Sequence, residues 1–185
     1  MKKLLLNFCL IVTTSSFAQS TSKIDCNTTN FQELKVDLIN TTLKLPTYST
    51  IDSSKRGELE GCLLKYVINS NDKSLNTEVT VYNVSDYPDQ IMEQVMEGRG
   101  KMILEGMDFE KDFTLIYDSL LVINNIKVGI IKFKLKGSDN KLYALMVYFF
   151  IGKKQVNINF QETVKEGVTE KNSLAECIVK TLIFY

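Results

Sequence analysis

Apolar and polar residues alternate through most of the chain after Phe113, and a period of two is the pattern of a β-strand. Short turns at Asn124–Asn125, at 137–140 and at 152–154 separate the alternating segments, and connections of this length predict hairpins. The segments therefore form an antiparallel meander of four strands, which read FTLIYDSLLVI, KVGIIKFKLK, KLYALMVYFFI and QVNINFQ. The third is apolar on both faces, which predicts a central strand covered on both sides.

The first half of the chain contains further strands. Residues 34–45 alternate, with a turn at Asn40–Thr41, and Pro46 ends the pairing because proline cannot donate to a ladder. The segments CLLKYVI and TEVTVYNV predict another hairpin, joined by the turn NSNDKSLN.

Two segments have the spacing of helices. Ser85 and Asp86 offer an N-cap, Pro88 sits in the first turn, and apolar residues then recur on one stripe. The stripe comprises Tyr87, Ile91, Val95, Met102 and Met107. A second amphipathic helix, TEKNSLAECIVK, turns Leu174, Cys177 and Ile178 inward, and Leu182–Phe184 then pair as a final strand. The predicted class is α+β, with a mostly antiparallel sheet, one mid-chain helix and one C-terminal helix.

The N-terminus has the three parts of a secretory signal peptide. Lys2 and Lys3 form a cationic start, Leu4 to Val12 is apolar, and Ser16–Ala18 supplies small residues for cleavage after Ala18. The apolar run is shorter than the roughly 20 residues of a membrane span, so no span is predicted. We expect residues 1–18 to be removed, 19–33 to be an extended lead-in, and 34–185 to form a single domain in the periplasm or the medium.

The composition limits the chemistry. The sequence has no histidine, so neither a Ser-His-Asp nor a Cys-His catalytic site can be built. Removal of residues 1–18 takes two lysines from the 22 basic residues, which leaves 20 basic against 22 acidic side chains. A nearly neutral chain has no net attraction for nucleic acid, so no nucleic-acid partner is predicted. No cofactor is predicted either.

Three stretches of the sequence resemble the PsbP-like superfamily: TLKLPTYS, INNIKVGIIKFK and ECIVKTLIFY. The superfamily includes the photosystem subunit PsbP, bacterial DcrB-type lipoproteins and the Ran-binding Mog-type proteins. The sequence departs from the family pattern at Tyr48, Asn125 and Thr181, where tryptophan, glycine and serine are usual. The resemblance covers residues 34–185, and it implies an αβα sandwich in an exported bacterial member with non-enzymatic accessory or binding work.

The cysteines favour one disulfide bond. Cys26, Cys62 and Cys177 remain after the signal peptide is removed, and cysteines of an exported protein can form disulfides in an oxidising compartment. A Cys26–Cys62 bridge would tie the lead-in to a strand and stabilise the fold by about 3–4 kcal/mol. The alternative is that no bridge forms. Cys177, on the inward stripe of its helix, is expected to behave as a small buried hydrophobic residue.

Two charged clusters are candidate sites. Lys132, Lys134 and Lys136 form a basic row on one strand face, which is either a docking patch for an acidic surface or a solubilising face. Asp108, Glu110 and Asp112 occupy alternate positions, so an extended segment would project their carboxylates to one side. They form either a weak cation site or a solvated acidic loop.

The function predicted from these observations is that of a non-enzymatic binding or accessory module. It would present a docking surface or shallow cleft to an unidentified protein partner. The alternative is a hydrolase that uses carboxylates, or a carrier of a lipid or small ligand in a pocket between sheet and helix. Asp86, Asp89, Glu93 and Glu97 line the first helix and are the carboxylates that such a hydrolase could use, although helical residues at this spacing commonly form its solvated face.

Overall fold

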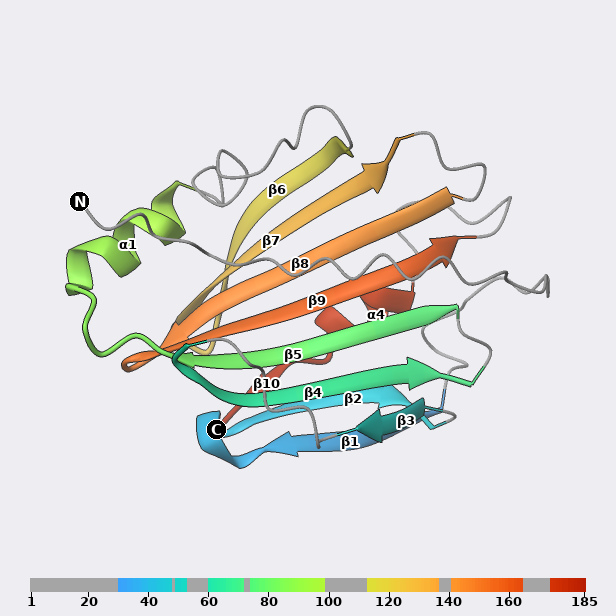
Figure 1. Ribbon diagram of the computed structural model, residues 1–185, viewed down its shortest axis with the longest axis horizontal. Helices are drawn as coiled ribbons and strands as arrows, with labels where there is room; N and C mark the ends of the chain where they lie inside the picture. The colour runs from blue at the N-terminus through green and yellow to red at the C-terminus, as the bar shows by residue number, and fades with distance from the viewer. Residues whose placement is uncertain are drawn as a thin grey trace.

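The computed structural model describes residues 30–47, 49–52, 60–71, 74–98, 113–136, 141–164 and 174–185. Its main element is a seven-stranded antiparallel sheet in the order β3-β4-β5-β9-β8-β7-β6 (Figure 1). The strands are β3 (Ser49–Asp52), β4 (Cys62–Ser70), β5 (Leu75–Asn83), β6 (Phe113–Ile123), β7 (Ile126–Leu135), β8 (Lys141–Ile151) and β9 (Lys154–Val164).

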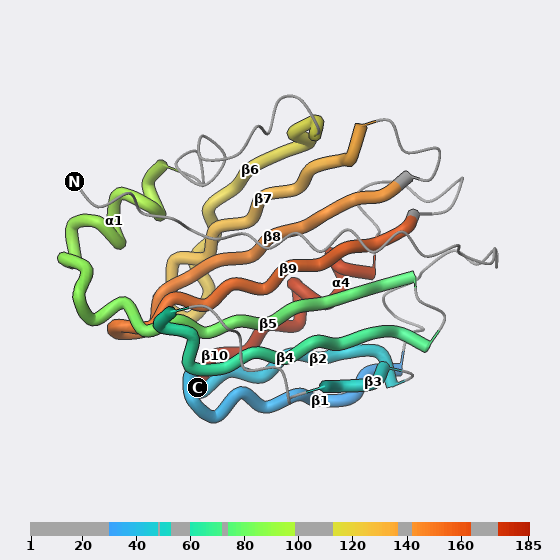
Figure 2. Tube along the Cα trace, in the orientation of Figure 1, coloured from blue at the N-terminus to red at the C-terminus, as the bar shows by residue number. Residues whose placement is uncertain are grey.

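The predicted meander is confirmed. Strands β6, β7, β8 and β9 follow one another and pair antiparallel, and Figure 2 traces their back-and-forth path. Asn124 and Asn125 both have positive φ, 48° and 64°, which is the conformation that a two-residue hairpin requires at both positions. Strand β8 lies between β9 and β7, and consecutive residues from Leu145 to Phe149 are all buried, so it is covered on both faces as predicted. The β4–β5 hairpin is confirmed as well.

A second, three-stranded sheet contains both ends of the described chain. Its order is β1-β2-β10, in which β10 is the terminal strand predicted from the apolar C-terminus. Strand β1 begins at Phe31, opposite Pro46, so residues 31–33 belong to the sheet and not to the lead-in. Asn40, with φ 47°, turns the chain between the first two strands. The elements are β1 (Phe31–Val36), a 3-10 turn η1 (Asp37–Ile39), β2 (Thr41–Pro46) and β10 (Ile183–Phe184).

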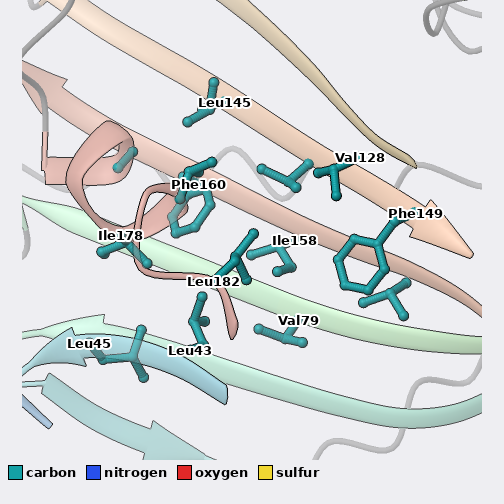
Figure 3. Close-up of a cluster of buried hydrophobic side chains, with 14 of the residues drawn as sticks. Leu43, Leu45, Val79, Val128, Leu145, Phe149, Ile158, Phe160, Ile178 and Leu182 are labelled. Atoms are coloured by element: carbon teal, nitrogen blue, oxygen red, sulfur yellow. The ribbon is translucent and has the colours of Figure 1, made fainter. Parts of the chain in front are cut away.

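One helix packs on each face of the large sheet. Helix α4 (Leu174–Val179) and the small sheet lie on one face, where their side chains share the main core with β5, β8 and β9 (Figures 1 and 3). Helix α1 (Asp89–Glu97) packs a smaller cluster on the other face. The α+β class is therefore confirmed. The main core includes Leu43, Leu45, Val79, Val128, Leu145, Phe149, Ile158, Phe160, Ile178 and Leu182.

Helix α1 differs in detail from the prediction. Pro88 occupies the N-cap position and no side chain caps the helix, so neither Ser85 nor Asp86 has that role. Val95 is buried as expected, and Met96 beside it is buried too. Ile91 is half-buried, but Tyr87 is exposed, so its place on the inward stripe was wrong. Met102 and Met107 lie outside the described residues.

Candidate functional site

The predicted basic row is not one surface. Lys132 is buried, with 1% of its surface exposed, whereas Lys134 is half-buried and Lys136 is exposed. Lys132 lies on the same face of β7 as Val128 and Ile130, whose side chains belong to the main core under α4. The periodicity put the three lysines on one face correctly, but it did not show that α4 covers the middle of that face. The prediction that Lys132, Lys134 and Lys136 form one exposed docking patch is therefore wrong at Lys132, which is buried.

Lys132 instead belongs to a polar cluster between the sheet and α4. Its Nζ lies 3.3 Å from Oε1 of Glu176, and 5.7 Å from the centroid of the Tyr143 ring. Tyr117, which faces Lys132 across the β6–β7 ladder, donates its hydroxyl hydrogen to the same Glu176 oxygen. We call Tyr117, Lys132, Tyr143 and Glu176 the buried ion-pair cluster. A buried ammonium needs such a carboxylate, because an uncompensated charge in the interior is strongly unfavourable.

A second carboxylate holds the beginning of α4. Glu162 of β9 is buried, and its Oε1 accepts the backbone N–H of Leu174 at 2.8 Å. Its Oε2 accepts the N–H of Ala175 at 3.3 Å. The first N–H groups of a helix have no partner within the helix, so this carboxylate satisfies donors that would otherwise be buried without one. Glu162 and Glu176 together attach a short helix to the sheet.

The cluster has the chemistry of a structural connection. Burial raises the pKa of Tyr117 well above its usual range, and the hydrogen bond to Glu176 and the charge of that residue raise it further. The phenol therefore stays protonated and donates, and it does not act as a base. Sequence reasoning missed this cluster because its members lie on β6, β7, β8 and α4. An acidic residue on the inward side of the C-terminal helix was the available signal.

Tyr148 presents a different kind of buried polar group, on the α1 face of the sheet. Its side chain is fully buried, and within the residues that the structure describes its Oη has no hydrogen-bond partner. Burial raises the pKa of Tyr148 to about 12, and the nearby charge of Asp118 contributes. The ring lies against Gly129, directly opposite on β7.

We expect Tyr148→Phe to flatten the alkaline loss of stability. A tyrosine with a raised folded pKa contributes stability that is present below its unfolded pKa of 10.0 and is lost as the pH rises toward about 12. The free energy of unfolding should fall by about 1.4 kcal/mol per pH unit for each such group. Guanidinium unfolding between pH 9 and pH 11.5 should therefore give a shallower slope for Tyr148→Phe than for the wild type, and equal slopes would contradict the assignment. At pH 7 removal of the unpartnered hydroxyl should be neutral or stabilising by up to about 1 kcal/mol.

The cysteines are paired differently from the prediction. Cys62 is a free thiol, so the Cys26–Cys62 bridge is wrong. Its Sγ lies 3.5 Å from the carbonyl oxygen of Leu64, turned back along its own strand. Cys177 is buried, as predicted, but it is disulfide-bonded and not a packed free thiol. Its partner lies outside the described residues, as does Cys26.

The structure describes only one of the two predicted acidic clusters. Asp108, Glu110 and Asp112 lie outside the described residues. The carboxylates of the α1 region are exposed, and Asp89 pairs with Lys153 at 2.5 Å. Among the described side chains, no group of three or more acidic, cysteine or histidine residues is arranged to hold a metal ion. The described helices also include none with the length and apolar character of a membrane span.

The last residues of the chain are hydrogen-bonded to two turns. The backbone N–H of Tyr185 donates to the carbonyl of Asn40 at 3.0 Å, and Asn124 Nδ2 donates to the carbonyl of Phe184 at 3.2 Å. These bonds join the end of the chain to η1 and to the β6–β7 turn. The Tyr185 side chain is 78% exposed, and Leu38 of η1 is also exposed. We call Leu38, Asn124 and Tyr185 the end surface. Sequence reasoning treated this apolar terminus as a strand only, which explains Phe184 but not Tyr185.

Comparison with solved structures identifies the architecture. The solution structure of cyanobacterial PsbP (CyanoP) from Synechocystis sp. PCC 6803 matches 90% of this chain and 98% of that chain, with a TM-score of 0.60 and 14% sequence identity. The chain has a PsbP-like fold. The predicted resemblance is thereby confirmed at the level of the fold, although the identity is too low for residue roles to be transferred.

A second similar structure is a crystal structure from Bacteroides thetaiotaomicron VPI-5482. It matches with a TM-score of 0.49 and 14% identity, over 83% of this chain and 48% of that chain. No family model matches the sequence. No curated protein matches it at a significant level either.

Proposed function

We propose that this protein is exported and acts as a non-enzymatic accessory protein that binds another protein. The N-terminal segment supports export, because Lys2, Lys3 and the apolar run that follows have the pattern of a signal peptide. The disulfide at Cys177 supports it too, since disulfides persist in oxidising compartments outside the cytoplasm. The PsbP-like fold is consistent with an accessory or binding module.

The end surface carries the proposal. Tyr185 exposes a large aromatic side chain while its backbone N–H is bonded to the carbonyl of Asn40, so its backbone is anchored and its ring is in water. A pre-positioned tyrosine contributes much apolar contact area for little loss of conformational entropy, and tyrosine is enriched among the residues that dominate binding energy. Leu38, two residues before Asn40 in the chain, also exposes apolar surface. This combination favours a protein-docking surface over a catalytic site.

The buried carboxylates weigh against the hydrolase alternative. Glu162 accepts two backbone N–H groups of α4, and Glu176 bonds Tyr117 and Lys132. Catalytic use of either residue would release the helix from the sheet. The helix α1 carboxylates are solvated, as expected for the outer face of a helix.

Site-specific photocrosslinking in the producing cells tests the proposal. A photoreactive phenylalanine analogue at position 185 should yield one discrete adduct with another protein, and Leu38→Glu in the same chain should abolish it. The matched control carries the analogue at Asn69, an exposed position near the end of β4, and should give no adduct. N-terminal sequencing of the protein recovered outside the cytoplasm should begin at Gln19. The same adducts from both positions, or a retained leader on a cytoplasmic protein, would contradict the proposal.

A further inference from the structure

Strand β6 forms one edge of the large sheet in the described part of the chain. It is the last strand in the order, and among the described residues no strand pairs with its outer side. The opposite edge is formed by β3, which is only four residues long, whereas β6 has 11 residues. Natural proteins protect long edge strands with lysine, proline or covering elements, because unpaired backbone groups recruit other strands. Strand β6 contains no lysine, arginine or proline, and its only charged residue is Asp118.

The hairpin geometry shows which backbone groups of β6 point outward. In the two-residue turn at Asn124–Asn125, the closing pair Ile123–Ile126 exchanges ladder hydrogen bonds. Hydrogen-bonded and non-hydrogen-bonded pairs alternate along an antiparallel ladder. The N–H and C=O groups of Asp118, Leu120 and Val122 are therefore directed to the open edge. The register shift between Leu115 and Tyr117 ends this regular region, which we call the open stretch, residues 117–123.

We propose that the open stretch pairs antiparallel with the open stretch of a second copy of this chain, about a two-fold axis at Leu120. Residue 120 is the middle of the stretch, so all of it is paired in this register. The three outward-directed residues then face one another: Leu120 faces its own counterpart, and Asp118 faces the partner subunit's Val122. These are the positions at which an antiparallel pair exchanges both of its hydrogen bonds. Two seven-stranded sheets would join into one continuous sheet.

The side chains of the open stretch are complementary in this register. Val122 is 68% exposed and Leu121 is exposed as well, so pairing removes apolar surface from water. A register centred on Asp118 would place two carboxylates directly opposite each other, which is unfavourable. In the Leu120 register Asp118 lies in the same row as the partner subunit's Lys127, since Lys127 faces Val122 across the β6–β7 ladder. This charge arrangement favours a second copy as the occupant of the edge.

The pairing goes beyond the proposed function and uses other residues. Leu38, Asn124 and Tyr185 lie outside the open stretch, so the end surface and the β6 edge can be tested separately. Loss of the photocrosslinked adduct in Leu38→Glu with an unchanged subunit number would concern the end surface alone.

Charge substitutions at Val122 test the proposed register. Sedimentation velocity of the purified exported chain should show a concentration-dependent dimer. Val122→Glu, which faces Asp118 of the partner subunit twice in the dimer, should weaken association about tenfold or more, and less so at high salt. Val122→Lys places a positive charge opposite Asp118 of the partner subunit, so it should keep or tighten the dimer. Lysine on an unpaired edge strand otherwise opposes strand pairing. Val122→Thr is the neutral control, and Val122 is exposed, so circular dichroism should show each variant folded.

Several results would overturn the proposal. They are a wild-type monomer at all concentrations, equal dimerisation of the glutamate and lysine variants, and loss of the dimer in both. The last result would show that a charge of either sign at Val122 blocks association, so Asp118 of the partner subunit does not face it. As a second measurement, Leu120→Cys should oxidise to a covalent dimer, because an antiparallel hydrogen-bonded pair has a Cα separation of about 5.5 Å, within disulfide range. Asn69→Cys should not oxidise to a dimer, and a covalent dimer from it or none from Leu120→Cys would contradict the two-fold axis.

Discussion

Replacing Gly129 by alanine is expected to lower the free energy of unfolding by about 3 kcal/mol or more, near the upper end of the range for overpacking. A Cβ atom at this position would lie 2.1 Å from Cζ of Tyr148 and 2.5 Å from Cε1 and Cε2. The Tyr148 ring is fully buried and packs with the cluster under α1, so it has little room to move. Guanidinium unfolding at pH 7 measures the loss.

A double-mutant cycle shows whether the ring is the cause. In a Tyr148→Leu background the ring is gone, so Gly129→Ala should cost much less than in the wild type, and the interaction term should account for most of the loss. An alanine is otherwise no worse than glycine within a strand. If Gly129→Ala costs the same in both backgrounds, the backbone of β7 and not the Tyr148 ring requires glycine.

Replacing Glu176 by glutamine is the second change with a large expected effect. The substitution keeps the size of the side chain but removes the charge that lies 3.3 Å from the buried Lys132 ammonium. Loss of one member of a buried ion pair typically costs about 3–5 kcal/mol, because the other charge remains buried. We expect a loss of about 3 kcal/mol, since the Glu176 side chain is 14% exposed and some water can reach the site. Thermal and guanidinium unfolding measure it.

Two comparisons make this prediction specific. In a Lys132→Met background the buried charge is absent, so Glu176→Gln should cost far less than in the wild type. The exposed pair formed by Lys153 and Asp89 is the matched control, and Asp89→Asn should change stability by no more than about 1 kcal/mol. Equal costs for Glu176→Gln with and without Lys132 would show that the ion pair does not hold α4 to the sheet.

The strands were predictable because their signals are local. The run from Leu145 to Phe149 is apolar on both faces, and that alone places β8 inside a sheet. The turn at Asn124–Asn125 uses residues that tolerate positive φ, and the closing of a hairpin depends on little else. The terminal strand was predictable as well, since Leu182, Ile183 and Phe184 are apolar at the end of an amphipathic helix.

The candidate sites were less predictable because they depend on what covers each surface. Lys132 has the same alternation as Lys134 and Lys136, and nothing in its neighbourhood along the chain distinguishes it. The carboxylate that binds it comes from Glu176, 44 residues later. The cysteine pairing failed for a similar reason. The predicted bridge tied the lead-in to the strand that begins at Cys62, whereas the bonded residue is Cys177 on the last helix.

The sequence by itself determined the period of the meander strands, the hairpin turns and the inward stripe of the last helix, because each follows from interactions between residues a few positions apart. Only the tertiary structure decided which strand face is covered, that Lys132 is buried, that Tyr148 packs on Gly129, and that β6 is the edge strand of the described sheet. Those outcomes depend on how layers from distant parts of the chain stack, and side-chain periodicity carries no information about that arrangement.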